Sequence, residues 1–133
     1  MKQLTITTQW NHFEETYRQA DIAGIEAGNK IQPIAMVVNE HSNPLNDQSD
    51  IVKSYYVADG VCGFAWLELK GNTSFGKWAL AAHVARKGYP NGLAIWCHHF
   101  GQSMQRKTKW AHTVSQYLRD ELQVITHVCS RMD

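Results

Sequence analysis

The segment that most constrains this fold is the run VCGFAWLEL at residues 61–69. Both sets of its alternate residues are largely apolar, and the run is too short to cross a bilayer. A strand of this kind is typical of the centre of a sheet that is covered on both faces. Asp59-Gly60, just before it, suits a two-residue turn with positive φ angles, so residues 54–58 and 61–69 are predicted to form a β-hairpin.

The rest of the chain alternates between helical and extended patterns. Apolar residues at helical spacing predict helices at residues 8–26, 74–87 and 103–121. Further strands are predicted at residues 4–7, 34–38, 93–97 and 124–128, and a long loop at residues 39–50. We therefore expect one domain over residues 1–133, of the α/β or α+β class. It should contain a mixed sheet of about five strands, a β-hairpin and two to three packed helices.

Charge is distributed unevenly along the chain. Residues 1–69 contain four Lys or Arg and nine Asp or Glu, whereas residues 70–133 contain nine and three. No acidic residue lies between residues 70 and 119. Such a window favours a surface for polyanions, namely phosphate backbones, nucleotides or an acidic protein patch. The alternative is a basic face that contacts only water and counterions.

The candidate partner-binding residues come from this basic window. The helices predicted there should present cations to solvent, and aromatic residues beside them could stack on bases if they are exposed. The predicted binding residues are Lys77, Lys87, Arg106, Lys109, Trp110, His98 and His99, with Trp78, Tyr89, Trp96 and Phe100 as further stacking candidates.

Histidines and cysteines raise two other kinds of chemistry. Cys97 and His99 share a strand face, as do His127 and Cys129, and they would converge on a metal only if the two strands were neighbours. Their spacing is not that of paired zinc knuckles, so no metal and no cofactor is predicted. A histidine-dependent enzyme acting on nucleotides or nucleic acid remains an alternative; His98, His99 and His112 are its candidate acid–base residues, and none is assigned as catalytic.

The cysteine count and the N-terminal residues bear on the compartment. Three widely spaced cysteines favour reduced thiols over a disulfide framework. The first residues lack the apolar segment of a signal peptide, and no run is long enough to span a membrane. The expected location is the cytoplasm, with no membrane partner.

Several short segments together resemble small uncharacterised proteins encoded by bacteriophages. The resemblance covers about residues 55–133. It lies in Val61-Cys62-Gly63-Phe64-Ala65-Trp66, Gly71-Asn72 with Phe75, Ala85-Arg86-Lys87-Gly88, Gln102-Ser103-Met104 and Ser130-Arg131-Met132-Asp133. It implies expression in the cytoplasm of a bacterial host and a protein that binds host molecules. It brings no activity with it.

These observations lead to one functional expectation and two alternatives. The chain is expected to be a phage-type accessory binding protein, rather than an enzyme, whose partner is phosphate-rich or acidic: nucleic acid, a nucleotide signal or a host protein. Inhibition or sequestration of a host defence component would suit such a protein. The alternatives are the histidine-dependent enzyme and a homo-oligomer assembled through the acidic and basic halves.

Overall fold

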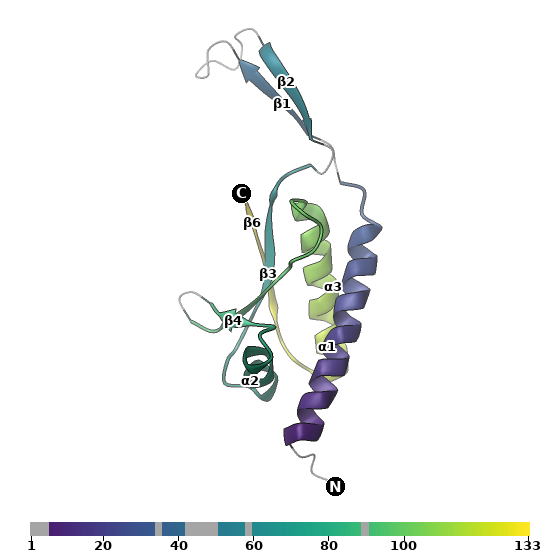
Figure 1. Ribbon diagram of the computed structural model, residues 1–133, viewed down its shortest axis with the longest axis vertical. Coiled ribbons are helices and arrows are strands. Elements are labelled where there is room, and N and C mark those ends of the chain that lie inside the picture. The colour runs from purple at the N-terminus through teal and green to yellow at the C-terminus, as the bar shows by residue number, and fades with distance from the viewer. Residues whose placement is uncertain (1–5, 34–35, 42–50, 58–59, 89–90) are drawn as a thin grey trace.

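The computed structural model describes residues 6–33, 36–41, 51–57, 60–88 and 91–133. Within them the chain is an α+β protein with three helices and six strands (Figure 1). The helices are α1 (Ile6–Asn29), α2 (Ser74–Ala81) and α3 (Met104–Leu122). The strands are β1 (Met36–His41), β2 (Ile51–Val57), β3 (Gly63–Leu69), β4 (Arg86–Lys87), β5 (Leu93–Trp96) and β6 (His127–Met132).

The main sheet has four strands in the order β4-β5-β3-β6, and every neighbouring pair is antiparallel. Two helical connections build it: α2 links β3 to β4, and α3 links β5 to β6. Each connection passes over one strand, so the parallel strands that it joins are never neighbours. The element order β-α-β-β-α-β with this strand order is the split βαβ, or ferredoxin-like, arrangement.

This topology corrects the predicted sheet. It has four strands rather than about five, and it is antiparallel rather than mixed. The predicted hairpin between residues 54–58 and 61–69 is wrong, because β2 pairs with β1 in a separate two-stranded sheet while β3 pairs with β5 and β6. Of the turn itself, Gly60 has the expected positive φ of 72°, and Asp59 lies outside the described residues.

Other predicted boundaries also moved. No strand occupies residues 6–7, which belong to α1, and residues 4–5 lie outside the described chain. The helix predicted over 74–87 ends at Ala81, because the chain turns there and His83 adopts a left-handed φ of 60°. The last strand begins at His127 instead of residue 124. β1 combines the end of the strand predicted at 34–38 with the start of the loop predicted at 39–50. The other residues of these two segments, 34–35 and 42–50, lie outside the described part of the chain.

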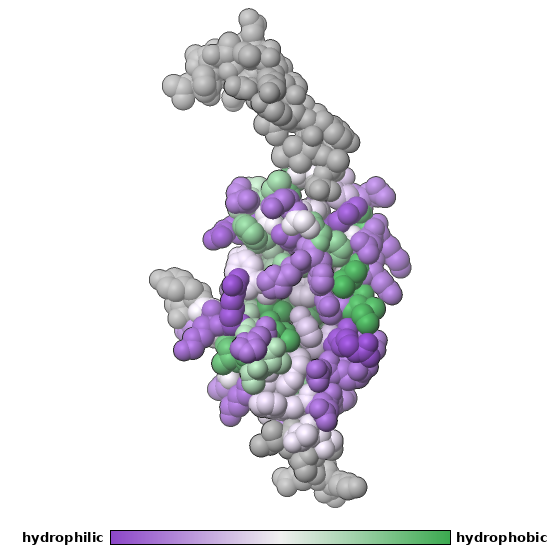
Figure 2. All heavy atoms as spheres, viewed as in Figure 1, coloured by the Kyte–Doolittle hydropathy of each residue, from purple (hydrophilic) through white to green (hydrophobic). Residues whose placement is uncertain are grey.

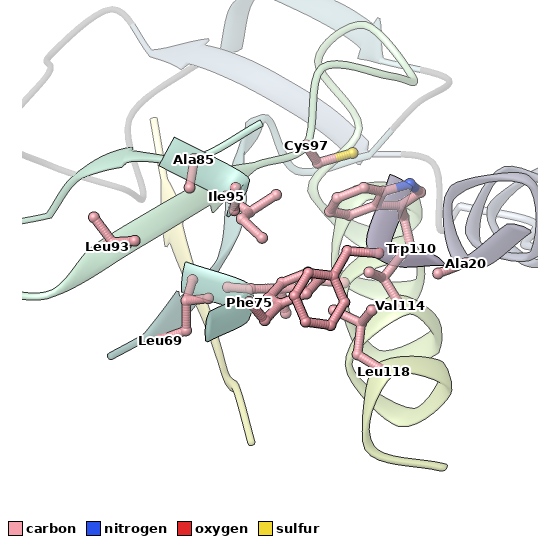
Figure 3. Close-up of a cluster of buried hydrophobic side chains, with 14 of the residues drawn as sticks. Ala20, Leu69, Phe75, Ala85, Leu93, Ile95, Cys97, Trp110, Val114 and Leu118 are labelled. Atoms are coloured by element: carbon pink, nitrogen blue, oxygen red, sulfur yellow. The ribbon is translucent and has the colours of Figure 1, made fainter. Parts of the chain in front are cut away.

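The core lies between the sheet and the helices. Alternation along β3 turns Ala65, Leu67 and Leu69 inward, where all three are buried. α3 supplies the largest buried side chain, Trp110, which is 1% exposed. Figure 3 shows this ring among side chains from the sheet and from α1 and α2. The apolar spacing that predicts a helix over residues 103–121 gives α3 a buried face with Ala111, Val114 and Leu118, and Leu122 is partly buried against the core.

α1 packs lengthwise against α3, on the same side of the sheet (Figure 1). α2 has only 8 residues, so it leaves room beside α3 that α1 fills. Phe13 of α1 meets α2 edge-on at Phe75, with ring centroids 5.5 Å apart. At Gly24 of α1 the two long helices come so close that an added Cβ would lie 2.6 Å from Trp110 Cδ1.

Four large apolar side chains are exposed among the residues whose burial the structure describes. They are Ile22, Leu80, Ile125 and Met132, and they come from separate elements. In the view of Figure 2, hydrophilic side chains cover much of the body and hydrophobic ones form small separate groups. No helix in the described ranges combines the length and the apolarity needed to cross a membrane.

The close approach of α1 and α3 gives a stability prediction. Gly24→Ala should lower the free energy of unfolding by about 1–3 kcal/mol, since the new methyl group must displace a buried indole. This exceeds the gain of up to about 1 kcal/mol that alanine brings to a helix. Urea unfolding followed by circular dichroism measures the difference.

Gly71→Ala is the matched control, because its Cβ would meet the nearest atom, Leu93 Cγ, at an ordinary 3.5 Å. It should change stability by less than about 0.5 kcal/mol. A Gly24→Ala protein as stable as the parent would show that this contact does not set the helix spacing.

Candidate functional site

The face of the main sheet that points away from the helices carries aromatic and basic side chains. In the described part of the chain, no helix covers this face (Figure 1). Since directly paired residues share a face, the register identifies its members: Trp66 lies between Trp96 and Cys129, and Phe64 lies opposite Arg131. We call this surface the outer face; its members are Phe64, Trp66 and Glu68 of β3, Arg86 of β4, Ala94 and Trp96 of β5, and His127, Cys129 and Arg131 of β6.

Three aromatic rings form the centre of the outer face. The indoles of Trp66 and Trp96 stack with centroids 4.6 Å apart and an interplanar angle of 26°. Phe64 meets Trp96 edge-on at 6.1 Å. All three side chains are partly exposed. Because Trp96 occupies one side of the Trp66 ring, the other side is turned toward β6, where the opposing side chain is the small Cys129.

Three cations surround these rings. The guanidinium of Arg86 lies 5.2 Å from the centroid of Trp96, and the strand order puts it on the side away from Trp66. Lys107 Nζ and the guanidinium of Arg131 lie 5.2 and 5.8 Å from the centroid of Phe64. Cations over ring faces are held by the ring quadrupole. The outer face therefore combines flat stacking surfaces with positive charge.

The acid on the outer face, Glu68, lies at one edge of the aromatic cluster. Its Oε1 accepts a hydrogen bond of 3.3 Å from Trp66 Nε1. Across the strands it is paired with Ala94 and His127. Because the indole N–H points along the ring plane, this contact places the carboxylate at the edge of the Trp66 ring and not over its face.

A separate polar cluster joins α1 to the start of α3. Asp21 Oδ1 accepts from Trp110 Nε1 at 2.9 Å and lies 3.0 Å from His99 Nε2. The carboxylate satisfies the N–H of a buried indole and fixes the loop before α3. His99 and Asp21 are both partly exposed, at 36% and 29% of their side-chain surfaces. Asp21 thus joins His99 and the buried Trp110 indole to α1, which is the geometry of a structural contact.

The predicted binding residues do not form one surface. Trp110 is in the core, where it cannot stack on a partner, and His99 is bonded to Asp21. Lys77 and Lys109 are exposed on α2 and α3, whereas Lys87 is on β4 and not on a helix as expected. Arg106 is partly buried on α3, and its Nε has no hydrogen-bond partner. Of the seven, His98 lines a pocket that opens on the outer face.

The further stacking candidates divide in the same way. Trp78 is 5% exposed, Phe100 packs against the core, and Tyr89 lies outside the described residues. Trp96 is the one of these candidates that belongs to the outer face.

The two pairs of cysteine and histidine that share strand faces do not come together in the described region. β3 separates β5 from β6, so Cys97 and His99 do not converge with His127 and Cys129. No three His, Cys, Asp or Glu side chains gather as metal ligands among the residues that the structure places. Burial raises the pKa of Cys97 to about 11, so this thiol stays protonated at neutral pH.

Sequence reasoning missed Phe64, Trp66, Arg86 and Arg131 of the outer face, and Lys107 of α3 beside it. The alternation along β3 is predicted correctly, but the face that carries Phe64 and Trp66 was expected to be buried and is partly exposed. The signal lay in the residue types: aromatic residues on that face alternate with the small and aliphatic residues of the core face. Arg86 and Arg131 become part of the site only once the strand order is known.

Comparison of the chain with protein-family models, curated proteins and solved structures found no match. The fold and the outer face therefore define the class: an α+β protein with an uncovered aromatic and cationic sheet surface. The resemblance to bacteriophage proteins, the action on a host defence component and the cytoplasmic location stay predictions.

The Asp21 cluster gives a second stability prediction. Asp21→Ala should lower the free energy of unfolding by about 1–3 kcal/mol, because the buried Trp110 N–H loses its acceptor. Asp21→Asn should lose less, since its amide oxygen can still accept. Thermal unfolding monitored by tryptophan fluorescence compares the two.

Glu15→Ala is the control on the same helix. Its ion pair with Arg18 is 2.7 Å long but solvent-exposed, so its loss should leave the unfolding midpoint nearly unchanged. Equal midpoints for Asp21→Ala and Glu15→Ala would contradict a structural role for Asp21.

Proposed function

We propose that this protein binds single-stranded nucleic acid on the outer face of its main sheet. The observation that carries the proposal is the stacked pair Trp66 and Trp96, with cations placed around it on an uncovered sheet face. Bases would stack on the aromatic rings, and phosphates would contact Arg86 and Arg131. This deepens the expectation of a phosphate-rich partner and moves its site from the helices to the sheet.

The arrangement of aromatic residues supports this choice among polyanions. Stacking requires unpaired bases, and every base offers a flat face, so such a surface binds single strands with little sequence preference. A surface made of cations alone would favour any polyanion equally. The rings therefore argue for nucleic acid over an acidic protein patch.

An analogy of fold points the same way. Some RNA-binding modules use a four-stranded sheet whose exposed aromatic residues each stack a base. Here the exposed aromatic residues lie on β3 and β5, the two central strands of the sheet. Since this architecture serves many functions, the analogy supports the proposal only together with the side chains themselves.

Binding to short labelled oligonucleotides tests the proposal. Wild-type protein should bind single-stranded DNA or RNA more tightly than a duplex of the same sequence, measured by fluorescence anisotropy. Trp66→Ala should weaken binding by about 5-fold to 100-fold, the value of one stacked base. With phosphate contacts from Arg86 and Arg131, the slope of log affinity against log salt should be about −1.4.

Lys77→Ala and Lys109→Ala are the controls, because these exposed lysines lie on helices and not on the outer face. They should change affinity much less than Trp66→Ala. No binding by the wild type would contradict the proposal. Weaker oligonucleotide binding in the two lysine variants alone would place the site on the helices. Binding of an acidic protein in place of the oligonucleotides would assign the outer face to a protein partner.

A further inference from the structure

Lys107 is a buried cation without a counter-charge among the described residues. It is 6% exposed, and its hydrogen bond is the 3.1 Å contact from Nζ to the carbonyl oxygen of Gly63. An ammonium group has three protons to donate. None of the carboxylates that the structure describes forms an ion pair with it. Burial of an ammonium is costly unless it is paired, so an anion at this position would be strongly favoured.

The backbone explains why a lysine of α3 reaches the outer face. β5 stays beside β3 as far as the bond from Cys97 N to Ala65 O, which is 3.0 Å long, and then leaves it. Gly63 N instead bonds to Gln102 O at 3.1 Å. At this opening Gly63 has no side chain, and a Cβ there would lie 2.8 Å from Met104 Sδ. Lys107 Nζ reaches the Gly63 carbonyl oxygen beside this opening.

A pocket of about 360 Å³ lies at this opening. Its walls include the rings of Phe64 and Trp96, the three cations Arg86, Lys107 and Arg131, and His98. No Asp or Glu is among its described lining residues. Three permanent charges thus converge on one small pocket that adjoins the stacking surface.

We propose that this pocket takes a phosphomonoester, the phosphate at the end of a single strand, while the base next to it stacks on the aromatic cluster. The inference rests on the proposed function. A phosphodiester inside a strand carries one negative charge, whereas a terminal phosphate carries between one and a half and two at neutral pH and has three terminal oxygens. It therefore matches three convergent cations better, and each guanidinium can bind two of its oxygens.

Competition with unlabelled octanucleotides of one sequence tests this assignment. The three competitors carry a 5′-phosphate, a 3′-phosphate or hydroxyl groups at both ends, and 5′-AMP serves as a fourth. One phosphorylated end should compete about 10-fold or more better than the hydroxyl-ended strand, as expected for charge-assisted hydrogen bonds. Lys107→Met should lose most of this preference, whereas Lys109→Met, which changes an exposed lysine on the same helix, should keep it.

Arg131→Gln provides a second variant should Lys107→Met fail to fold, because Arg131 is exposed on β6 and its loss leaves the core intact. It should also reduce the preference. Equal competition by all three strands, with Trp66→Ala still weakening each, would overturn the phosphate pocket and leave the proposed function standing. Absence of binding by every strand would overturn both. If 5′-AMP competes as strongly as a phosphorylated strand, the pocket binds a mononucleotide, and the proposal that its ligand is the end of a strand is wrong.

Discussion

Burial of one face of β3 against the helices determines the rest of this structure. Ala65, Leu67 and Leu69 pack under α3, and Leu67 and Trp110 are almost completely removed from water. Because successive side chains of a strand point to opposite faces, this packing leaves Phe64, Trp66 and Glu68 on the outer face. A shift of register by one residue would exchange the two sets and place an acid in the core. The core and the candidate site are therefore two consequences of one alternation.

The connections between strands then assemble the site from distant parts of the chain. Since α2 and α3 each pass over one strand, β5 comes to lie between β4 and β3, and β6 on the other side of β3. Trp96, Trp66 and Cys129 thereby form a row across three strands, and Arg86 of β4, which is paired with Ala94, places its guanidinium 5.2 Å from the Trp96 ring centroid. The row explains how a chain with a net charge of only +1 can present a concentrated cationic and aromatic surface.

Local sequence patterns predicted the positions of helices and strands better than they predicted which strands pair. The helix over residues 103–121 follows from apolar spacing, and α3 (Met104–Leu122) confirms it. The hairpin failed because Asp59-Gly60 is a local signal, whereas the pairing of β3 with β5 and β6 depends on contacts between residues far apart in the chain. The outer face was not predicted for the same reason: an apolar strand face does not reveal whether a helix covers it. In the sequence, Lys107 does not differ from the other cations of the basic window. Its burial and its hydrogen bond to the Gly63 carbonyl become visible only in the structure.

The five tryptophans offer the most direct measurement of the central claim, that single strands bind the outer face. Each indole N–H gives its own signal in a nitrogen–proton correlation spectrum of labelled protein, and an oligonucleotide can be added stepwise. We predict that the signals of Trp66 and Trp96 shift with added single strand, together with backbone amides of β3, β5 and β6, while those of the buried Trp78 and Trp110 stay in place. Shifts confined to the solvent sides of α1 and α3, with Trp66 and Trp96 unmoved, would contradict the account.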